Sequence, residues 1–233
     1  MHHFPRFGHG ASGCVFRRHA FVRPLVVCAV EAEAACARGL PLAQVVVSGV
    51  GRTNAAIATT RAILEDGPFD AVLSMGVAGA LPGCDPPLPL GAIVVASESV
   101  YHEEGLHAPD GFQDMTELGF PLGSFQGNRV PADPALIDSF KSLGRCGPIA
   151  TVASCSGTDD SALEVQARSG AIAEAMEGAA VLHTAQHFGL PGIEVRVISN
   201  TTGARPKQIW NLEQAFDPLR KSMPAIAECL SGR

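Results

Sequence analysis

The chain has 233 residues, of which 46% are hydrophobic, and a net charge of −6 at pH 7. This length favours one domain with an ample core, and the acidic balance argues against nucleic-acid or anionic-membrane partners, which require a basic face. No apolar run approaches the ~20 residues of a membrane span, and seven scattered cysteines without a Cys-x-x-Cys pair indicate free thiols in a reducing cytoplasm.

Residues 1–23 differ in composition from the rest of the chain. They contain four histidines and several arginines but no acidic residue, and they lack the apolar region of a secretory signal. We therefore expect a poorly ordered N-terminal extension followed by a single domain over residues 24–233.

Apolar, strand-like runs then alternate with helical patterns along the chain. In chain order, we expect strands at 24–30, 43–50, 69–75, 91–99, 148–154 and 193–199. Helices are expected at 31–38, 54–65, 133–143, 161–169, 177–188 and 211–230. Gly76–Gly79 reads as a tight turn, and residues 101–128 read as a long loop of the kind that is more often functional than idle. The alternation predicts an α/β three-layer sandwich with a central, mostly parallel twisted sheet.

Polar and small residues follow several of these expected strands. In open α/β sheets, ligands bind beyond the carboxyl ends of the strands. One pocket is therefore expected where these ends converge, formed by Glu33, Gly76–Gly79, Tyr101, Ser156 and Asn200.

Two segments carry most of the chemistry: Met176-Glu177, at a helix start, and Arg196-Val-Ile-Ser-Asn200, at a strand end. A carboxylate can bind neighbouring hydroxyls, and an amide can read the edge of a flat heterocycle. Both are features that a nucleoside site requires. The plainer interpretation is an acid at a helix N-terminus and a buried strand with a polar end.

Five segments in order resemble the nucleoside phosphorylase superfamily, in the branch of methylthioadenosine/S-adenosylhomocysteine nucleosidases. They are 25–33, 48–56, 74–81, Met176-Glu177 and 196–200. Within that branch, the Gly after Met-Glu, the Ser-Asn pair and Trp210 most resemble futalosine hydrolases. The resemblance spans roughly residues 24–230 and implies a homodimer or higher homo-oligomer.

The resemblance also implies catalytic roles. Glu33 would orient and deprotonate the attacking water, Glu177 would accept both ribose hydroxyls, Met176 would lie against the sugar, and Arg196 would support the nucleophile site. From the residues alone, Glu33 could equally be a solvated helix-start acid, Met176 a core residue and Arg196 the partner of a buried carboxylate.

Two positions depart from the pattern of the adenine-specific nucleosidases. Asn200 replaces an Asp that protonates the purine at N7, and an amide suits the O6 and N7 acceptors of a 6-oxopurine better. How N7 is protonated is left open, with water as one source. Near Val77, Ala78 and Gly79, which would border the substrate, Ser74 replaces an Arg of the phosphorylases and Val77 replaces a Ser. This turn offers a phosphate dianion only backbone N–H groups, so water is the expected nucleophile.

The 5′ substituent of futalosine carries a benzoate and would need aromatic or basic contacts. The candidates are Arg52, Tyr101, His102, Phe112, Arg205, Lys207 and Trp210. Each could instead be a surface cation or core aromatic; Trp210, which closely follows Asn200, is the preferred pocket wall.

No cofactor or metal is expected. The glycines around Gly49-Val-Gly51 do not complete a dinucleotide fingerprint, and the adjacent residues His102, Glu103 and Glu104 cannot all face one ion without a special loop. The expected function is hydrolysis of futalosine to hypoxanthine and the 5′-modified ribose in menaquinone biosynthesis. The alternatives are a methylthioadenosine/S-adenosylhomocysteine-type nucleosidase, a purine nucleoside phosphorylase, or a non-catalytic nucleoside-binding protein.

Overall fold

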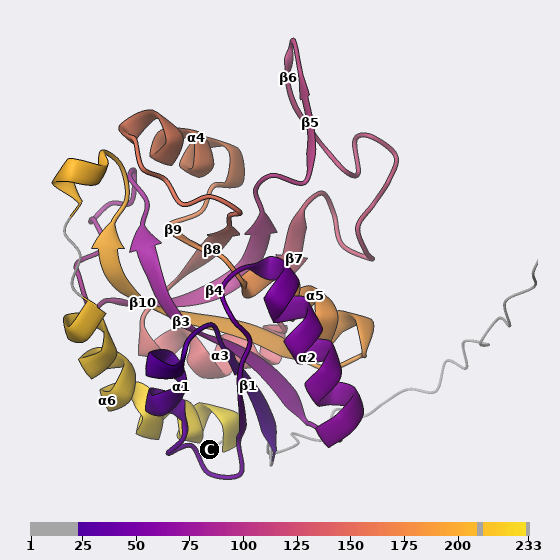
Figure 1. The fold of residues 1–233 in the computed structure, drawn as a ribbon, viewed down its shortest axis with the longest axis vertical. Helices are drawn as coiled ribbons and strands as arrows, with labels where there is room; N and C mark the ends of the chain where they lie inside the picture. The colour runs from indigo at the N-terminus through magenta and orange to yellow at the C-terminus, as the bar shows by residue number, and fades with distance from the viewer. Residues whose placement is uncertain (1–22, 209–211, 232–233) are drawn as a thin grey trace, which may run out of the picture.

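The computed structural model describes residues 23–208 and 212–231, and Figure 1 shows the arrangement of their helices and strands. The strands are β1 (Pro24–Cys28), β2 (Gln44–Val47), β3 (Ala71–Ala80), β4 (Ile93–Tyr101), β5 (Gly105–Ala108), β6 (Gly111–Asp114), β7 (Arg129–Pro131), β8 (Arg145–Thr151), β9 (Ala173–Ala175) and β10 (Gly192–Thr201). The helices are α1 (Glu31–Ala37), α2 (Arg52–Asp66), α3 (Pro134–Phe140), α4 (Asp159–Ser169), α5 (Gly178–His187) and α6 (Leu212–Ser231), with short 3₁₀ turns η1 (Lys141–Leu143) and η2 (Arg205–Lys207).

The main sheet closes on itself. β10, β4, β8, β9 and β3 form a ring of paired strands that the β3–β10 pairing completes, while β1 and β2 extend from β3 and β7 pairs with β4. The pairings of β4 with β10, β3 with β9 and β4 with β7 are antiparallel, whereas the other pairings of this sheet are parallel. The α/β class is confirmed, but the sheet is mixed and barrel-like, so the expectation of a mostly parallel sheet is only partly right.

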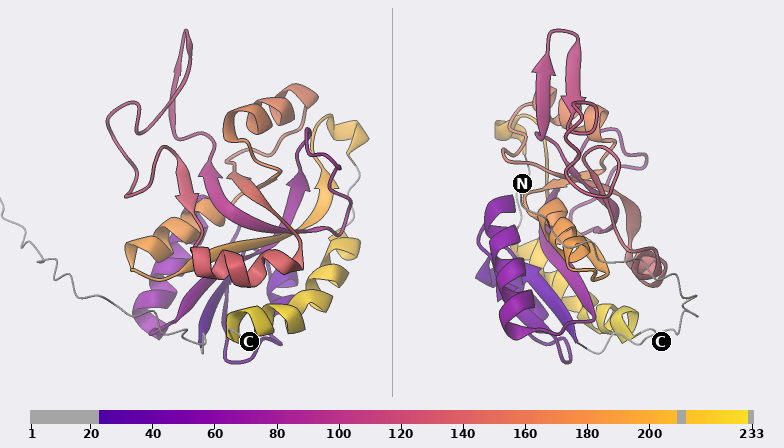
Figure 2. Two further views of the ribbon diagram at one scale, coloured as in Figure 1. Left: turned by 180° about the vertical axis from the view of Figure 1, so that it is seen from behind. Right: turned by 90° about the vertical axis from the view of Figure 1, so that its right-hand side faces the viewer.

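Helices cover the sheet because its central strands are buried along almost their whole length. Every residue of β1 is buried, as are nine of the ten residues of β3 and of β10, and strands buried on both faces require packed elements on both sides. α2 packs beside α5, and α6 packs against α1, α3 and β10 (Figure 2). The largest cluster of buried side chains lies between these helices and the sheet.

Two of the expected irregular segments are ordered strands instead. Gly76–Gly79, expected as a turn, lies inside β3, where β10 pairs with the whole segment and β9 pairs with Gly79. The expected loop 101–128 contains the hairpin β5–β6, which projects from the body in both figures. Residues 1–22 of the expected N-terminal extension, and Trp210, lie outside the described residues.

In the described part of the chain, no helix is long and apolar enough to cross a membrane.

Candidate active site

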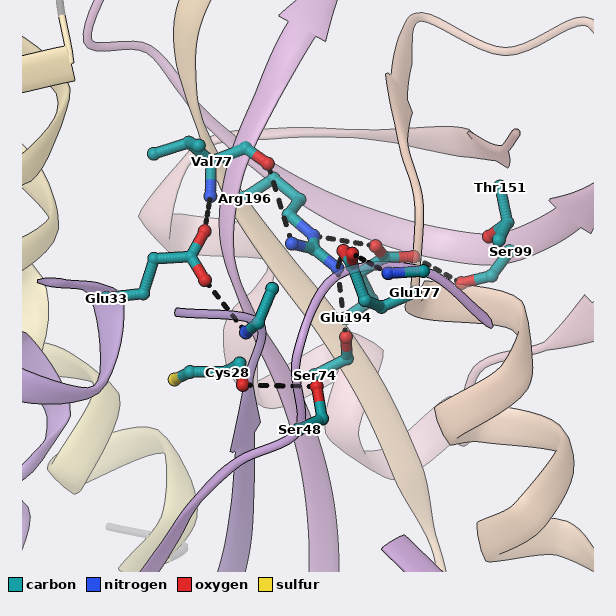
Figure 3. Close-up of polar contacts among 12 residues, drawn as sticks. Cys28, Glu33, Ser48, Ser74, Val77, Ser99, Thr151, Glu177, Glu194 and Arg196 are labelled. Carbon is teal, nitrogen blue, oxygen red and sulfur yellow. Dashed lines mark hydrogen bonds and ion pairs between the residues drawn. The ribbon is translucent and has the colours of Figure 1, made fainter. Parts of the chain in front are cut away.

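Glu33 is held in place almost entirely by backbone N–H groups. It lies in the first turn of α1 and is 3% exposed. One carboxylate oxygen, Oε2, accepts hydrogen bonds from the N–H of Ala29 at 2.9 Å and of Val30 at 3.2 Å, and Oε1 accepts one from Val77 at 2.9 Å (Figure 3). A carboxylate has about four acceptor sites, so about one remains for a further donor such as water. The structure therefore places Glu33 in the site, unlike its exposed neighbour Glu31.

Arg196 is the cation at the centre of the site, and it is 1% exposed. Its Nε donates to Glu194 Oε1 at 2.8 Å, and its Nη2 lies 3.2 Å from Glu177 Oε2 and donates to Ser74 Oγ at 3.1 Å (Figure 3). Burial lowers the pKa of Arg196, but attraction to Glu194, Glu177 and Glu33 outweighs it and leaves the pKa raised. The guanidinium is therefore a permanent positive charge among three carboxylates.

Glu33 and Arg196 approach each other over Gly76. A Cβ atom at Gly76 would lie 2.3 Å from Glu33 Oε1 and 2.7 Å from Arg196 Nη1. Both distances are shorter than any van der Waals contact, so only glycine allows the two groups this position. The sequence had marked Gly76 as part of a turn, whereas its role is to admit side chains from α1 and β10 to the face of β3.

Glu177 stands at the N-cap position of α5 but does not cap the helix. Its Oε1 instead accepts the N–H of Gly51 at 2.9 Å, and its Oε2 pairs with Arg196. The side chain is 6% exposed. Two of its about four acceptor sites are thus used, and two are left, which matches a pair of adjacent hydroxyl donors.

Glu194 was missed by the sequence reasoning. It is fully buried on β10, where it accepts from Arg196 Nε and from Ser99 Oγ. Burial raises the pKa of Glu194, while Arg196 and Ser99 oppose the rise. Its signal was available, since Glu194 and Arg196 are opposite charges two residues apart in an apolar strand and so face the same side.

A second group of expected residues lines a cavity of about 240 Å³. Its walls include Gly79, Ser156, Glu174, Asn200, Arg205 and Gln208. Asn200 is 6% exposed; its Nδ2 donates to the Thr201 carbonyl at 2.9 Å, and its Oδ1 accepts from Ser199 Oγ at 2.9 Å. Asn200 lies four residues beyond Arg196 on β10, at most about 13 Å at 3.3 Å per residue and less across the register shift between Ile198 and Asn200, a span comparable with the length of a nucleoside.

The remaining expected contacts are dispersed. Met176 packs against the apolar cluster that includes Leu81 and Val165, and Ala78 is buried with its carbonyl accepting from Ser199. The N–H of Val77 donates to Glu33 and is therefore not free to contact a substrate.

The candidates for the 5′ substituent separate into distinct places. Tyr101, His102 and Phe112 border one cavity of about 190 Å³, together with Arg168, whose guanidinium lies 4.0 Å from the Phe112 ring centre. Arg52 pairs with Glu103 at 3.1 Å and Glu104 at 3.4 Å. Arg205 and Lys207 lie on η2, where Arg205 borders the cavity of Asn200.

Across residues 23–208 and 212–231, no group of three His, Cys, Asp or Glu side chains is placed to hold a metal ion.

The chain matches the Phosphorylase superfamily over residues 28–229. A futalosine hydrolase of Streptomyces coelicolor is 33% identical over 189 residues, which cover 78% of this chain and 77% of that protein. A futalosine hydrolase of Thermus thermophilus is 34% identical, covering 76% of this chain and 77% of that protein. Among solved structures, a methylthioadenosine/S-adenosylhomocysteine nucleosidase of S. pneumoniae with a transition-state inhibitor superposes with a TM-score of 0.73 at 20% identity, covering 90% of this chain and 99% of that one.

Proposed function

The chain belongs to the phosphorylase superfamily, and we propose that it hydrolyses the N-glycosidic bond of futalosine, releasing hypoxanthine. Two futalosine hydrolases that are 33% and 34% identical over three quarters of the chain support this assignment. The observation that carries it is the buried arrangement of Glu33 and Glu177 around Arg196. In this arrangement, the Glu33 carboxylate has about one unused acceptor site for a water, and the Glu177 carboxylate has about two for the ribose hydroxyls.

In this mechanism, water attacks the anomeric carbon as its bond to purine N9 breaks. Glu33 accepts the water proton late, when the water meets a sugar with cationic character. Glu177 holds the ribose hydroxyls by charge-assisted hydrogen bonds, and its negative charge favours the developing cation. Arg196 pairs with both Glu177 and Glu194 and fixes the orientation of Glu177. The departing base takes up a proton, for which water is a source.

The leaving group follows from Asn200. An amide can donate to the O6 or N7 acceptor of hypoxanthine, whereas it cannot supply the proton that an Asp delivers to adenine N7. The cavity beside Asn200 lies at the distance along β10 that a base attached to the ribose would need.

Water is favoured over phosphate because the main donors near Gly76 are already engaged by carboxylates. The N–H of Val77 binds Glu33, and the guanidinium of Arg196 pairs with Glu194 and Glu177. A phosphate dianion would require cationic or multiple free N–H donors. The carboxylate of Glu33 would also repel it.

The test is base release from futalosine, inosine and methylthioadenosine in phosphate-free buffer, followed by chromatography. We expect hypoxanthine from futalosine at the same rate with and without added phosphate. A rate that rises in proportion to phosphate would identify a phosphorylase instead. Binding of nucleosides with no turnover of any would support the non-catalytic alternative.

An adenine-releasing nucleosidase is the second candidate, since a methylthioadenosine/S-adenosylhomocysteine nucleosidase is 30% identical over 69% of this chain. The Asn200→Asp variant separates the two. We expect it to lose about 10- to 100-fold in kcat/KM for futalosine, because a buried carboxylate faces the O6 and N7 acceptors. Adenine release from methylthioadenosine should rise in the same variant. If the unaltered protein already prefers methylthioadenosine, Asn200 does not select 6-oxopurines.

We further propose a cytoplasmic homo-oligomer acting in menaquinone biosynthesis, as the resemblance to futalosine hydrolases implies. Cys28, Cys36, Cys84, Cys146, Cys155 and Cys229 are free, as suits a reducing compartment. Ile57 and Leu64, seven residues apart on α2, and Val50, which precedes this helix, are more than half exposed, and such an apolar patch suits a subunit interface. Light scattering of the protein would give the mass of the assembly to compare with 24.2 kDa.

A further inference from the structure

Three neighbouring strands align Asn200, Gly79 and Glu174 in one row. Asn200 of β10 and Glu174 of β9 are both register partners of Gly79 on β3. Since adjacent strands lie about 4.8 Å apart, the outer two backbones are about 10 Å apart. A Cβ atom at Gly79 would lie 2.8 Å from Thr202 Cγ2, 3.0 Å from Asn200 Nδ2 and 3.6 Å from Glu174 Cγ. The absence of a side chain at Gly79 therefore lets the side chains of Thr202, Asn200 and Glu174 approach the same point of β3.

Glu174 is a buried carboxylate that the proposed mechanism does not use. It is 4% exposed, and Ser156 donates to it twice, from its N–H at 2.8 Å and from its Oγ at 2.6 Å. Burial raises the pKa of Glu174, whereas the two bonds from Ser156 lower it. Each oxygen thus accepts one bond from Ser156. About two acceptor sites are left for a ligand in the cavity that Glu174 borders.

The hydrogen-bond donors and acceptors on the purine decide which base Asn200 and Glu174 can bind. A 6-oxopurine presents acceptors at O6 and N7 and a donor at N1–H. Adenine presents an acceptor at N1, which has no hydrogen for a carboxylate oxygen to accept.

We propose that Glu174 accepts the N1–H of a 6-oxopurine while Asn200 contacts O6 and N7, so that the two side chains read the base from both ends of the row over Gly79. This inference rests on the proposed nucleosidase function and names Glu174 as a second selector of the leaving group. Ser156 is a positioning residue, because it fixes the carboxylate without contacting the base.

The Glu174→Gln variant tests the proposal with futalosine and its 6-amino analogue, which carries adenine in place of hypoxanthine. We expect kcat/KM for futalosine to fall about 10- to 100-fold, the usual effect of losing a hydrogen bond to a charged group. The 6-amino analogue should change by less than about threefold, because a Gln amide can donate to adenine N1. An equal loss on both substrates would overturn the proposal and leave Glu174 a structural residue.

Glu65→Gln is the matched control, since Glu65 is an exposed residue of α2 that pairs with Arg61 on the same helix. It should leave both rates unchanged. If Glu174→Gln does not fold, the proposal can still be tested by measuring the binding of free bases to the unaltered protein. Free 1-methylhypoxanthine keeps O6 and N7 but lacks N1–H, and it should bind at least about tenfold more weakly than hypoxanthine by calorimetry. Equal binding of the two bases would overturn the proposal.

The two levels of inference fail separately. If the unaltered protein cleaves neither nucleoside, the proposed function is wrong, while the binding of free hypoxanthine, 1-methylhypoxanthine and adenine still decides the role of Glu174. If futalosine is cleaved but Glu174→Gln leaves the base preference unchanged, the function stands and the second selector is rejected.

Discussion

Replacing Glu33 with Gln is expected to lower kcat for hypoxanthine release by about 10³-fold, within the usual range for loss of a general base. An amide cannot take the water proton, and its NH₂ group would face at least one of the N–H donors of Ala29, Val30 and Val77. KM should change little, because Glu33 does not hold the sugar in the proposed mechanism. Initial rates of base release across a range of futalosine concentrations give both constants.

The matched control is Glu31→Gln, two residues away on the same helix. Glu31 is exposed and pairs with Arg38, so kcat should remain at the original value. Thermal unfolding of both variants verifies that they fold. Retention of more than about a third of the activity by Glu33→Gln would exclude Glu33 as the base.

Replacing Arg196 with Met is expected to lower the free energy of unfolding by about 3–5 kcal/mol, the usual cost of removing one partner from a buried ion pair. Glu194 is fully buried and Glu177 nearly so, and both would lose their cation. Urea unfolding at neutral pH measures the change. Activity should be lost as well, because Glu177 would no longer be fixed.

The double variant Arg196→Met/Glu194→Met separates charge from packing. It removes the cation and its most buried carboxylate together, so we expect it to be more stable than Arg196→Met alone. Arg61→Met, which breaks an exposed pair on α2, should have little effect. A single Arg196→Met variant as stable as the original protein would show that the buried cluster contributes nothing to folding.

The sequence predicted β1, α4 and most of β10 because their signals are local. β1 is apolar and buried throughout, β10 is buried except at its last residue, and α4 has Thr158 as its N-cap and Gly170 in a left-handed conformation at its end. β3 was expected to end at residue 75, but it continues to Ala80. The short strands β7 and β9, of three residues each, are too brief for any periodicity to show. The relative direction of paired strands could not be predicted either, because the order of the elements along the chain does not indicate that β9 runs antiparallel to β3.

For the candidate site, the resemblance to a known family identified the residues, and the structure added how close they lie and which of them form pairs. The structure brings Glu33 close to Arg196 across Gly76 of β3, and Glu177, just before α5, pairs with Arg196 of β10. Glu174 and Glu194 were not assigned roles, because the partner of an acidic residue in an apolar segment can be identified only once the positions of the neighbouring elements are known. Gly76 and Gly79 were assigned to a turn, since glycine usually marks one, whereas here it admits side chains from neighbouring elements.

The contact between Gly178 and Glu194 has a consequence for how such sequences can diverge. A Cβ atom at Gly178 would lie 1.9 Å from Glu194 Oε2, so no larger residue can follow Glu177 while Glu194 keeps its place. Conversely, a smaller side chain at position 194 would open room for alanine at position 178 but would deprive Arg196 of its 2.8 Å partner. The residue types at positions 178 and 194, which are 16 positions apart in the chain, therefore constrain each other. In related proteins, these two positions should change as a pair.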